Sequence, residues 1–398
     1  MDKNRQAYLD NLKLYVVVLA VIMHLAMAYG GLGDWYYKEQ GLIGGVPLVI
    51  YNFFQLFTQS YFLGIMFIIT GYFVPASYEK KGPAKFIKDR AIRLGIPALA
   101  YMLAVSPFIS GVLLGGGAFE PAAYLRYVLS FEFLGRSGPL WFAVAALAFS
   151  LAYAAYAGCA GRAAGAGRAG HAGRAAGAGH AGRAGRAASD GRAFPSTPII
   201  IGFVLLMGAC TFITRIAQPM GAKAMGIPLC FIPQHALLFA VGASCRRNGW
   251  LDKLVYAKGR RWLVFGLAFG ALAWLAILVA TGASGSGFET LLGGAGWQSA
   301  AYAIWESAVS VSMAIGLLAL FKEKLDMQNR LAGAMSKSAF AVFVFHPPVI
   351  VALTLLFRPF DAPLATKFLI LSMPSVLSCF LFANFVIGKI PIIKKLFM

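Results

Sequence analysis

Two residues in the first apolar segment, Lys13 and His24, have a spacing that suits a site reaching from a membrane boundary into the bilayer. They are eleven residues apart, so on an α-helix they return to within about 20° of the same face and are separated by about 16.5 Å, roughly half the hydrocarbon thickness. A histidine whose pKa is near neutrality suits general-base catalysis near the middle of the membrane. A histidine that is hydrogen-bonded between helices only for packing is an equally consistent interpretation of these residues alone.

Two arginines form a second candidate site. Arg90 and Arg93 are an i, i+3 pair at the start of the third apolar segment. Adjacent guanidinium groups at a membrane boundary can hold a phosphorylated ligand. The alternative is that they only mark a cytoplasmic loop, as Arg260 and Arg261 do.

Three further residues are weaker candidates, each with a structural alternative. Trp141 follows Gly138-Pro139-Leu140, where anchoring at the membrane interface is the usual role of tryptophan. Glu306, near the outer end of an apolar segment, could bind an acceptor hydroxyl or orient an imidazole, or lie at the interface. His346 precedes two prolines, and a histidine there can satisfy a backbone carbonyl that the prolines leave unpaired.

The segments that carry these residues are long and apolar. With 59% hydrophobic and 13% charged residues, the composition excludes a soluble protein and predicts an all-α, polytopic membrane protein. A spanning helix needs about 20 apolar residues. The ten segments that qualify are 14–30, 49–74, 94–115, 139–157, 198–214, 227–243, 262–281, 302–321, 338–357 and 368–387.

The charge pattern predicts the orientation of these helices. The chain has 35 Lys and Arg against 15 Asp and Glu. If all ten segments span, 28 of the 35 basic residues fall on one side, which the positive-inside rule assigns to the cytoplasm together with both termini. A cleaved signal peptide ending near Ala26-Met27-Ala28 is disfavoured, because its removal would break this alternation. The excess charge needs no nucleic acid partner.

Two features are not expected to contribute chemistry. The five cysteines are far apart with no C-x-x-C spacing, so neither a metal site nor a disulfide framework is predicted. Residues 158–195 consist largely of Gly, Ala and Arg, and such a composition predicts a disordered cytoplasmic loop that can contact anionic lipid headgroups. Residues 1–398 are expected to form a single membrane-embedded domain that contains this loop.

Four stretches together resemble the motifs of the integral-membrane acyltransferase type 3 family, which O-acylates carbohydrates and other extracytoplasmic acceptors. Their order and spacing cover nearly the whole chain, although Lys13 replaces the family's commoner arginine, and Thr70 and Tyr72 replace Ser and Phe. The stretches are Tyr8-Leu9-Asp10-Asn11-Leu12-Lys13 with His24; Phe67-Ile68-Ile69-Thr70-Gly71-Tyr72-Phe73; Phe86-Ile87-Lys88-Asp89-Arg90-Ala91-Ile92-Arg93; and Pro139-Leu140-Trp141-Phe142 with Phe343-Val344-Phe345-His346.

This resemblance implies an enzyme of the cell (cytoplasmic) membrane. It would move an acyl group of the acetyl or succinyl class from cytoplasmic acyl-CoA, a co-substrate rather than a permanently bound cofactor, to a hydroxyl of an extracytoplasmic carbohydrate or related acceptor. By likeness the family's catalytic role passes to His24, and its donor-binding role passes to Arg90 and Arg93. The mechanism expected from this adds Lys13 as a third donor-binding residue and His24 as a general base. Trp141, Glu306 and His346 are the candidate substrate-binding residues, and the glucan-modifying branch looks nearest. Direct transfer and an acyl-imidazole intermediate both remain open.

Two other classes of protein fit part of the pattern. A secondary transporter also places ionisable residues and broken helices in the membrane. Transporters often contain internal repeats, but no motif of segments one to five recurs in segments six to ten. A non-catalytic membrane subunit would tolerate the loss of His24.

Overall fold

A computed structural model describes residues 6–41, 43–117, 119–169, 193–282 and 286–397. Among these residues the structure is helical apart from loops and one isolated β-bridge between Ala224 and Ile227. The prediction of an all-α protein is confirmed.

The described residues contain ten helical segments that are long and apolar enough to cross a membrane, the number predicted. Four of the ten segments are composite, because the third combines α-helical and π-helical turns and three others begin or end with a 3₁₀ turn. The segments are α1 (Ala7–Ala28), α2 (Gly45–Lys81), Pro83–Leu113 (which includes α3, Pro83–Arg90, and α4, Ile96–Ala100), Gly138–Ala160 (within which α6, Trp141–Ala169, begins), α7 (Thr197–Ala217), Leu229–Asn248 (which contains α8, Ile232–Asn248), α9 (Tyr256–Thr281), α11 (Trp297–Lys324), α12 (Arg330–Leu356) and Leu364–Lys389 (which contains α13, Leu364–Phe385). The short helices α5 (Pro121–Leu129), α10 (Glu289–Leu292) and α14 (Pro391–Phe397) connect or follow them.

Several helices extend beyond their predicted ends. The first was expected to begin at residue 14 and begins at Ala7, because hydropathy detects only the apolar part of a helix whose polar turns continue outside the hydrocarbon. His24 is therefore four residues from the last residue of α1, Ala28, or about 6 Å along the axis. It lies near one end of its helix and not at the centre.

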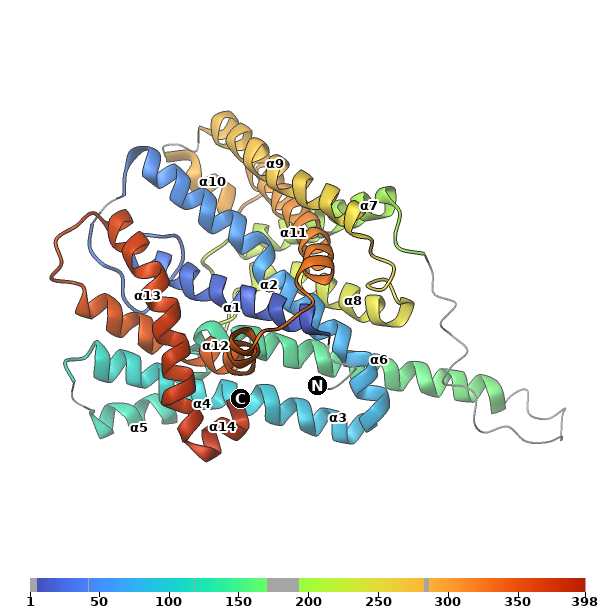
Figure 1. Cartoon of the computed structure of the whole chain (residues 1–398), viewed down its shortest axis with the longest axis horizontal. Helices are drawn as coiled ribbons and strands as arrows, with labels where there is room; N and C mark the ends of the chain where they lie inside the picture. The colour runs from blue at the N-terminus through green and yellow to red at the C-terminus, as the bar shows by residue number, and fades with distance from the viewer. Residues whose placement is uncertain (1–5, 42, 118, 170–192, 283–285, 398) are drawn as a thin grey trace.

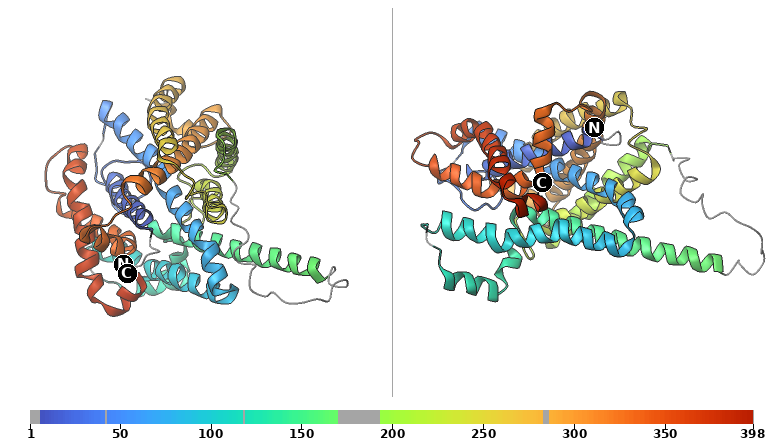
Figure 2. Two further views of the ribbon diagram at one scale, coloured as in Figure 1. Left: turned by 45° about the vertical axis from the view of Figure 1, so that its right-hand side comes forward. Right: turned by 60° about the horizontal axis from the view of Figure 1, so that its bottom comes forward.

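The interior of the bundle is formed by α1, α2 and α11, as Figure 1 shows. α1 contacts α2, α11, α12 and α13, and α2 contacts α8 along its length. The α2–α8 contact depends on Gly71 and Gly242: a Cβ atom at either position would overlap a backbone carbonyl of the other helix, that of Phe239 or Ile68. Small residues permit such close helix packing in membranes. At the periphery, α6 extends beyond the rest of the bundle in both views of Figure 2.

The loops alternate between two faces of the bundle, as consecutive spans require, and an even number of spans puts both termini on one face. On the face where α1 begins, the Lys322 ammonium donates to the carbonyls of Leu251 and Asp252 at 2.7 and 2.9 Å, and the Asn11 amide donates to the carbonyl of Leu325 at 2.7 Å. We call this the N-terminal face.

Loops at the other ends of the helices meet on the opposite face. Lys223 forms an ion pair with Asp34 at 2.9 Å, and Lys367 forms one with Glu39. These contacts join the α1–α2 loop to the α7–α8 connection and to the first turn of α13. The alternation on which the orientation prediction depends is thus present.

The low-complexity segment differs in part from its prediction. α6 continues through Gly158, the first residue of the predicted loop, as far as Ala169, because alanine has the strongest helix propensity and the stretch is alanine-rich. Residues 170–192 of the predicted loop lie outside the described residues.

Candidate active site

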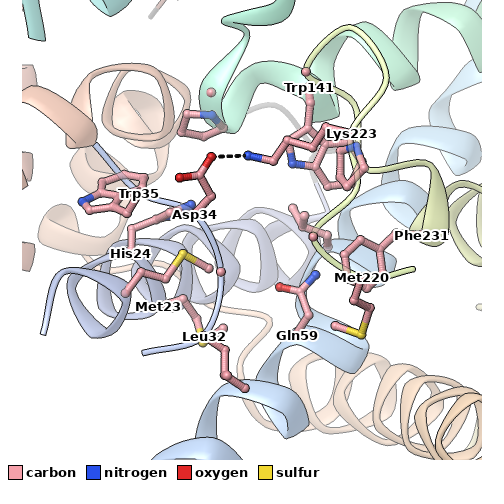
Figure 3. A pocket seen from close by; sticks show the side chains of 18 of the residues that line it. Met23, His24, Leu32, Asp34, Trp35, Gln59, Trp141, Met220, Lys223 and Phe231 are labelled. Carbon is pink, nitrogen blue, oxygen red and sulfur yellow. Dashed lines mark hydrogen bonds and ion pairs between the residues drawn. The ribbon is translucent and has the colours of Figure 1, made fainter. Parts of the chain in front are cut away.

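A cavity of about 360 Å³ enters the bundle from the opposite face, with His24 among the residues that line it. The C-terminal end of α1, the α1–α2 loop and α2 form one part of its wall, and the turn before α6 and the α7–α8 connection form another (Figure 3). It opens near Asp34 and Lys223, whose side chains are 78% and 40% exposed. His24 therefore faces a space reached from the side away from the N-terminal face.

Next to His24, a second histidine approaches from α12. Nε2 of His346 lies 3.1 Å from Nδ1 of His24, and Nδ1 of His24 is also 2.7 Å from the carbonyl oxygen of Ala20. Nδ1 of His346 is 2.9 Å from the carbonyl oxygen of Phe343 and 3.2 Å from that of Val342. His346 is fully buried and does not line the cavity.

These partners determine where the protons of two neutral rings reside. A carbonyl oxygen only accepts hydrogen bonds, so Nδ1 of His346 carries its proton and its Nε2 is an acceptor. Nδ1 of His24 then faces two acceptors and carries the proton of that ring. Nε2 of His24 is left with a free electron pair, which is the state a general base requires.

Trp35, from the α1–α2 loop, covers both imidazoles. Its ring centroid is 4.4 Å from that of His24, with the planes at 31°, and 6.2 Å from that of His346, with the planes at 11°. Its own loop is held at both sides by the Asp34–Lys223 and Glu39–Lys367 ion pairs. Sequence reasoning did not single out Trp35, because it lies in a loop and its contact with His24 arises only in the fold.

The remaining lining combines amide and aromatic side chains with a few charges. Gln55 and Gln59 come from α2, and Trp141 stands at the start of α6. Figure 3 shows the Asp34–Lys223 ion pair between the rings of Trp35 and Trp141 in this view. Of the three predicted substrate-binding residues, Trp141 is the one that lines this cavity.

Glu306 is placed elsewhere. It is fully buried in α11 and accepts a hydrogen bond from Nη2 of Arg215, in α7, at 2.6 Å. The guanidinium of Arg215 also lies 5.0 Å from the ring centroid of Tyr302 and 5.7 Å from that of Phe231. Phe231 lines the cavity whereas Glu306 does not, so one aromatic side chain links this ion pair to the cavity wall.

The sequence profile of a family described as "Acyltransferase domain" matches residues 6–384. The chain belongs to this acyltransferase family. The match spans all ten membrane-spanning segments except the last residues of the tenth, and it is the family that the motifs resemble. Comparisons with curated proteins and with solved structures gave no match.

This acyltransferase is thus a multi-pass membrane enzyme, which disfavours the transporter and the non-catalytic subunit. In its described part, no group of three or more His, Cys, Asp or Glu side chains is arranged to hold a metal ion. Its cavity is lined by amide, aromatic and charged side chains.

The predicted donor-binding residues of the acyltransferase lie toward the N-terminal face. Nε of Arg93 donates to Asp89 at 3.0 Å, and Lys81 shares the same carboxylate at 2.7 Å. Arg90 ends α3 with its guanidinium 5.2 Å from the ring centroid of Phe86, and its Nε atom has no partner. Asp89 therefore partly neutralises Arg93, whereas Arg90 forms no ion pair among the described residues.

Lys13 belongs to a separate group on the same side of the acyltransferase. Its ammonium lies 5.0 Å from the ring centroid of Phe73 and 3.2 Å from Asp10. The neighbouring Tyr72 ring contacts the guanidinium of Arg246, in α8, at 5.5 Å, and its hydroxyl accepts from Nη1 of Arg246 at 3.4 Å. Sequence reasoning counted Arg246 only as a cytoplasmic marker, since the contact between α2 and α8 is not visible in the sequence.

Proposed function

We propose that the protein transfers an acyl group of the acetyl or succinyl class from acyl-CoA, supplied at the N-terminal face, to a hydroxyl of a carbohydrate that enters the cavity from the opposite face. The observation that carries this proposal is the position of His24, with its free Nε2 electron pair, inside that cavity. By the positive-inside rule the N-terminal face is cytoplasmic, and the cell membrane is then the expected location.

The cavity lining supports a carbohydrate as the acceptor. Trp35 and Trp141 offer flat apolar faces, and Gln55 and Gln59 offer amide donors and acceptors for hydroxyl groups. A volume of about 360 Å³ is within the range of sites that hold small molecules. The lining therefore suits one sugar unit whose remaining chain extends into solvent.

In the proposed step, Nε2 of His24 accepts the proton of the acceptor hydroxyl while the oxygen of that hydroxyl attacks the thioester carbonyl. The new ester forms, the carbon–sulfur bond breaks, and the CoA thiolate takes the proton back from His24. The products are the acylated sugar and CoA, and His24 returns to its starting state. The positive charge that develops on His24 spreads through Nδ1 toward Ala20 and His346, which accept from it.

The donor side is supported by charge. CoA carries a diphosphate and a 3′-phosphate, and guanidinium and ammonium groups bind such anions well. Arg90, Arg93, Lys13 and Arg246 lie toward the N-terminal face, and α1 connects Lys13 to His24 over eleven residues, about 16.5 Å. A pantetheine arm extending along α1 would bring the thioester toward His24.

Transfer of radiolabelled acetyl from acetyl-CoA to an oligosaccharide panel by the detergent-purified protein tests this proposal. Turnover should fall by about 10²–10⁴-fold in His24→Ala, the range for losing a general base, with the melting temperature unchanged. His180→Ala, in the low-complexity segment, is the matched control and should retain full turnover. Wild-type turnover in His24→Ala would exclude the mechanism, and label retained on the protein without acceptor would indicate the acyl-imidazole route.

A further inference from the structure

Basic side chains lie at the mouth of the cavity, on the face where the positive-inside rule predicts few basic residues. Seven of the 35 Lys and Arg residues fall on the opposite side in the orientation argument, and two of the seven, Arg136 and Lys223, line the cavity. Others have structural partners: Arg215 and Lys367 are in ion pairs, and Lys38 donates to the carbonyl of Gly31. Lys223 pairs with Asp34 at the mouth itself, and Arg136 enters no ion pair among the described residues, so the presence of both at the cavity calls for another explanation.

The segments that bear these two residues touch each other. Gly226 has φ +75, and a Cβ atom there would overlap the carbonyl oxygen of Gly135, the neighbour of Arg136. Ala224, next to Lys223, exchanges backbone hydrogen bonds with Ile227 at 3.0 and 2.9 Å. A glycine is required at 226 both for its φ and for this close approach. Arg136 and Lys223 are therefore presented by two turns packed backbone to backbone.

The charged lining of the cavity has a net charge of +1. It comprises Arg136 and Lys223 against Asp34, with His24 neutral. Lys223 is paired with Asp34 at 2.9 Å, whereas Arg136 is exposed and enters no ion pair in the described part of the chain. Burial raises the pKa of the nearby Tyr36, so that hydroxyl stays neutral and does not offset Arg136. One cation is left without a counter-charge at the mouth.

A buried donor in the wall also lacks a partner. Gln55 is 2% exposed and lines the cavity. Its Oε1 accepts from the backbone N–H of Leu32 at 2.7 Å, and its Nε2 has no hydrogen-bond partner among the residues that the structure describes. An unpaired buried donor destabilises the empty site, and an oxygen-rich ligand would satisfy it.

We propose that the acceptor is an acidic carbohydrate. Its oxyanion binds Arg136 and replaces Asp34 as the ion-pair partner of Lys223, and its other oxygens accept from Nε2 of Gln55. This inference rests on the proposed function and names the class of its acceptor. Asp34 occupies Lys223 when the cavity is empty. Because Asp34 precedes Trp35, whose ring covers His24, the exchange also loosens the loop that covers the base.

Calorimetric titration of the purified protein with glucuronate, glucose 6-phosphate and glucose at low ionic strength tests the inference. The two acidic sugars should bind about tenfold more tightly than glucose, and added salt should reduce this preference. Comparing the affinity for glucuronate with that for glucose 6-phosphate shows whether the cavity mouth prefers a carboxylate or a phosphate. Equal affinity for all three sugars, or no binding of any, overturns the proposal.

The variants separate the mouth from general surface charge. Arg136→Gln and Lys223→Gln should weaken binding of the acidic sugars more than that of glucose and so remove the preference, whereas Asp34→Asn should strengthen binding of the acidic sugars. Arg126→Gln is the matched control, because Arg126 is an exposed arginine of α5 that does not line the cavity. An equal loss in Arg126→Gln would contradict a specific site.

Sugar binding and acetyl transfer are measured separately, so the failure of one proposal can be distinguished from the failure of the other. Acetyl transfer without a preference for acidic sugars would leave the proposed function standing and reject this inference. Charge-selective binding without transfer from any acyl-CoA would reject the proposed function and leave the acidic ligand in place.

Discussion

Nε2 of His346 lies 3.1 Å from Nδ1 of His24, although the two residues are 322 positions apart in the sequence. His346 had been expected to bind substrate, but the cavity lining does not include it. Its other ring nitrogen is held by the carbonyls of Phe343 and Val342, and this arrangement selects the tautomer in which Nε2 of His24 carries the free electron pair. We infer that His346 is a positioning residue that acts through His24.

Replacing His346 should therefore lower kcat and leave donor binding intact. His346→Ala removes the acceptor that orients the His24 ring, and small misplacements of a reacting group cost up to about a hundredfold in rate. His346→Gln retains a side-chain acceptor and should recover part of the loss. Steady-state kinetics with acetyl-CoA should show a changed kcat with an unchanged KM for the donor; an unchanged kcat in folded His346→Ala would contradict this role.

The arginine pair is expected to act on donor affinity. In Arg90→Ala/Arg93→Ala, the charge-assisted hydrogen bonds to the phosphates of CoA are lost, and calorimetry should show acetyl-CoA binding weakened tenfold or more. Arg260→Ala/Arg261→Ala removes two charges from the start of α9 and is the control. Unchanged binding in the first pair would return it to the role of a cytoplasmic marker.

The sequence was sufficient to predict the helices because each is specified locally. A run of apolar residues and the alternation of basic loops depend only on neighbouring residues, so ten spans were predicted and ten are present in the described residues. The ends were less accurate, as α1 and α2 show, because polar turns such as those of Lys80 and Lys81 remain helical outside the apolar run.

The candidate site was only partly predictable, because its contacts join distant segments. His24 was found from its helix position and its motif, and Trp141 from its motif. The approach of His346 from α12, the cover by Trp35 and the partnership of Arg215 with Glu306 all depend on how helices pack. One signal for the last pair was available: Arg215 is a basic residue on the side where the positive-inside rule disfavours it.

Trp141 is expected to contribute to acceptor binding. Its ring lines the cavity and packs 5.5 Å from the ring centroid of His235 and 6.5 Å from that of Phe67. Trp141→Leu keeps an apolar side chain but removes the flat face that stacks on a sugar, so the KM for the acceptor should rise several-fold. Donor affinity should be unchanged, and a parallel loss of acetyl-CoA binding would contradict an acceptor-side role.

Variants of Glu306 test whether its buried carboxylate stabilises the fold or takes part in the reaction. Its side chain and that of Arg215 are fully buried and paired at 2.6 Å. Removing one partner of such a pair leaves an uncompensated charge and costs about 3–5 kcal/mol. Glu306→Ala should therefore lower the melting temperature clearly, and Arg215→Met should do the same.

The double variant Arg215→Met/Glu306→Leu distinguishes the two roles, because it removes both charges together. A buried pair replaced by apolar residues of similar size is often as stable as before, so the melting temperature should return close to that of the wild type. If turnover returns with it, the pair serves to hold α7 against α11 beside Phe231. If the double variant is stable but inactive, Glu306 takes part in acceptor binding, as its place in the sequence suggested, and the cavity must extend past Phe231 during the reaction.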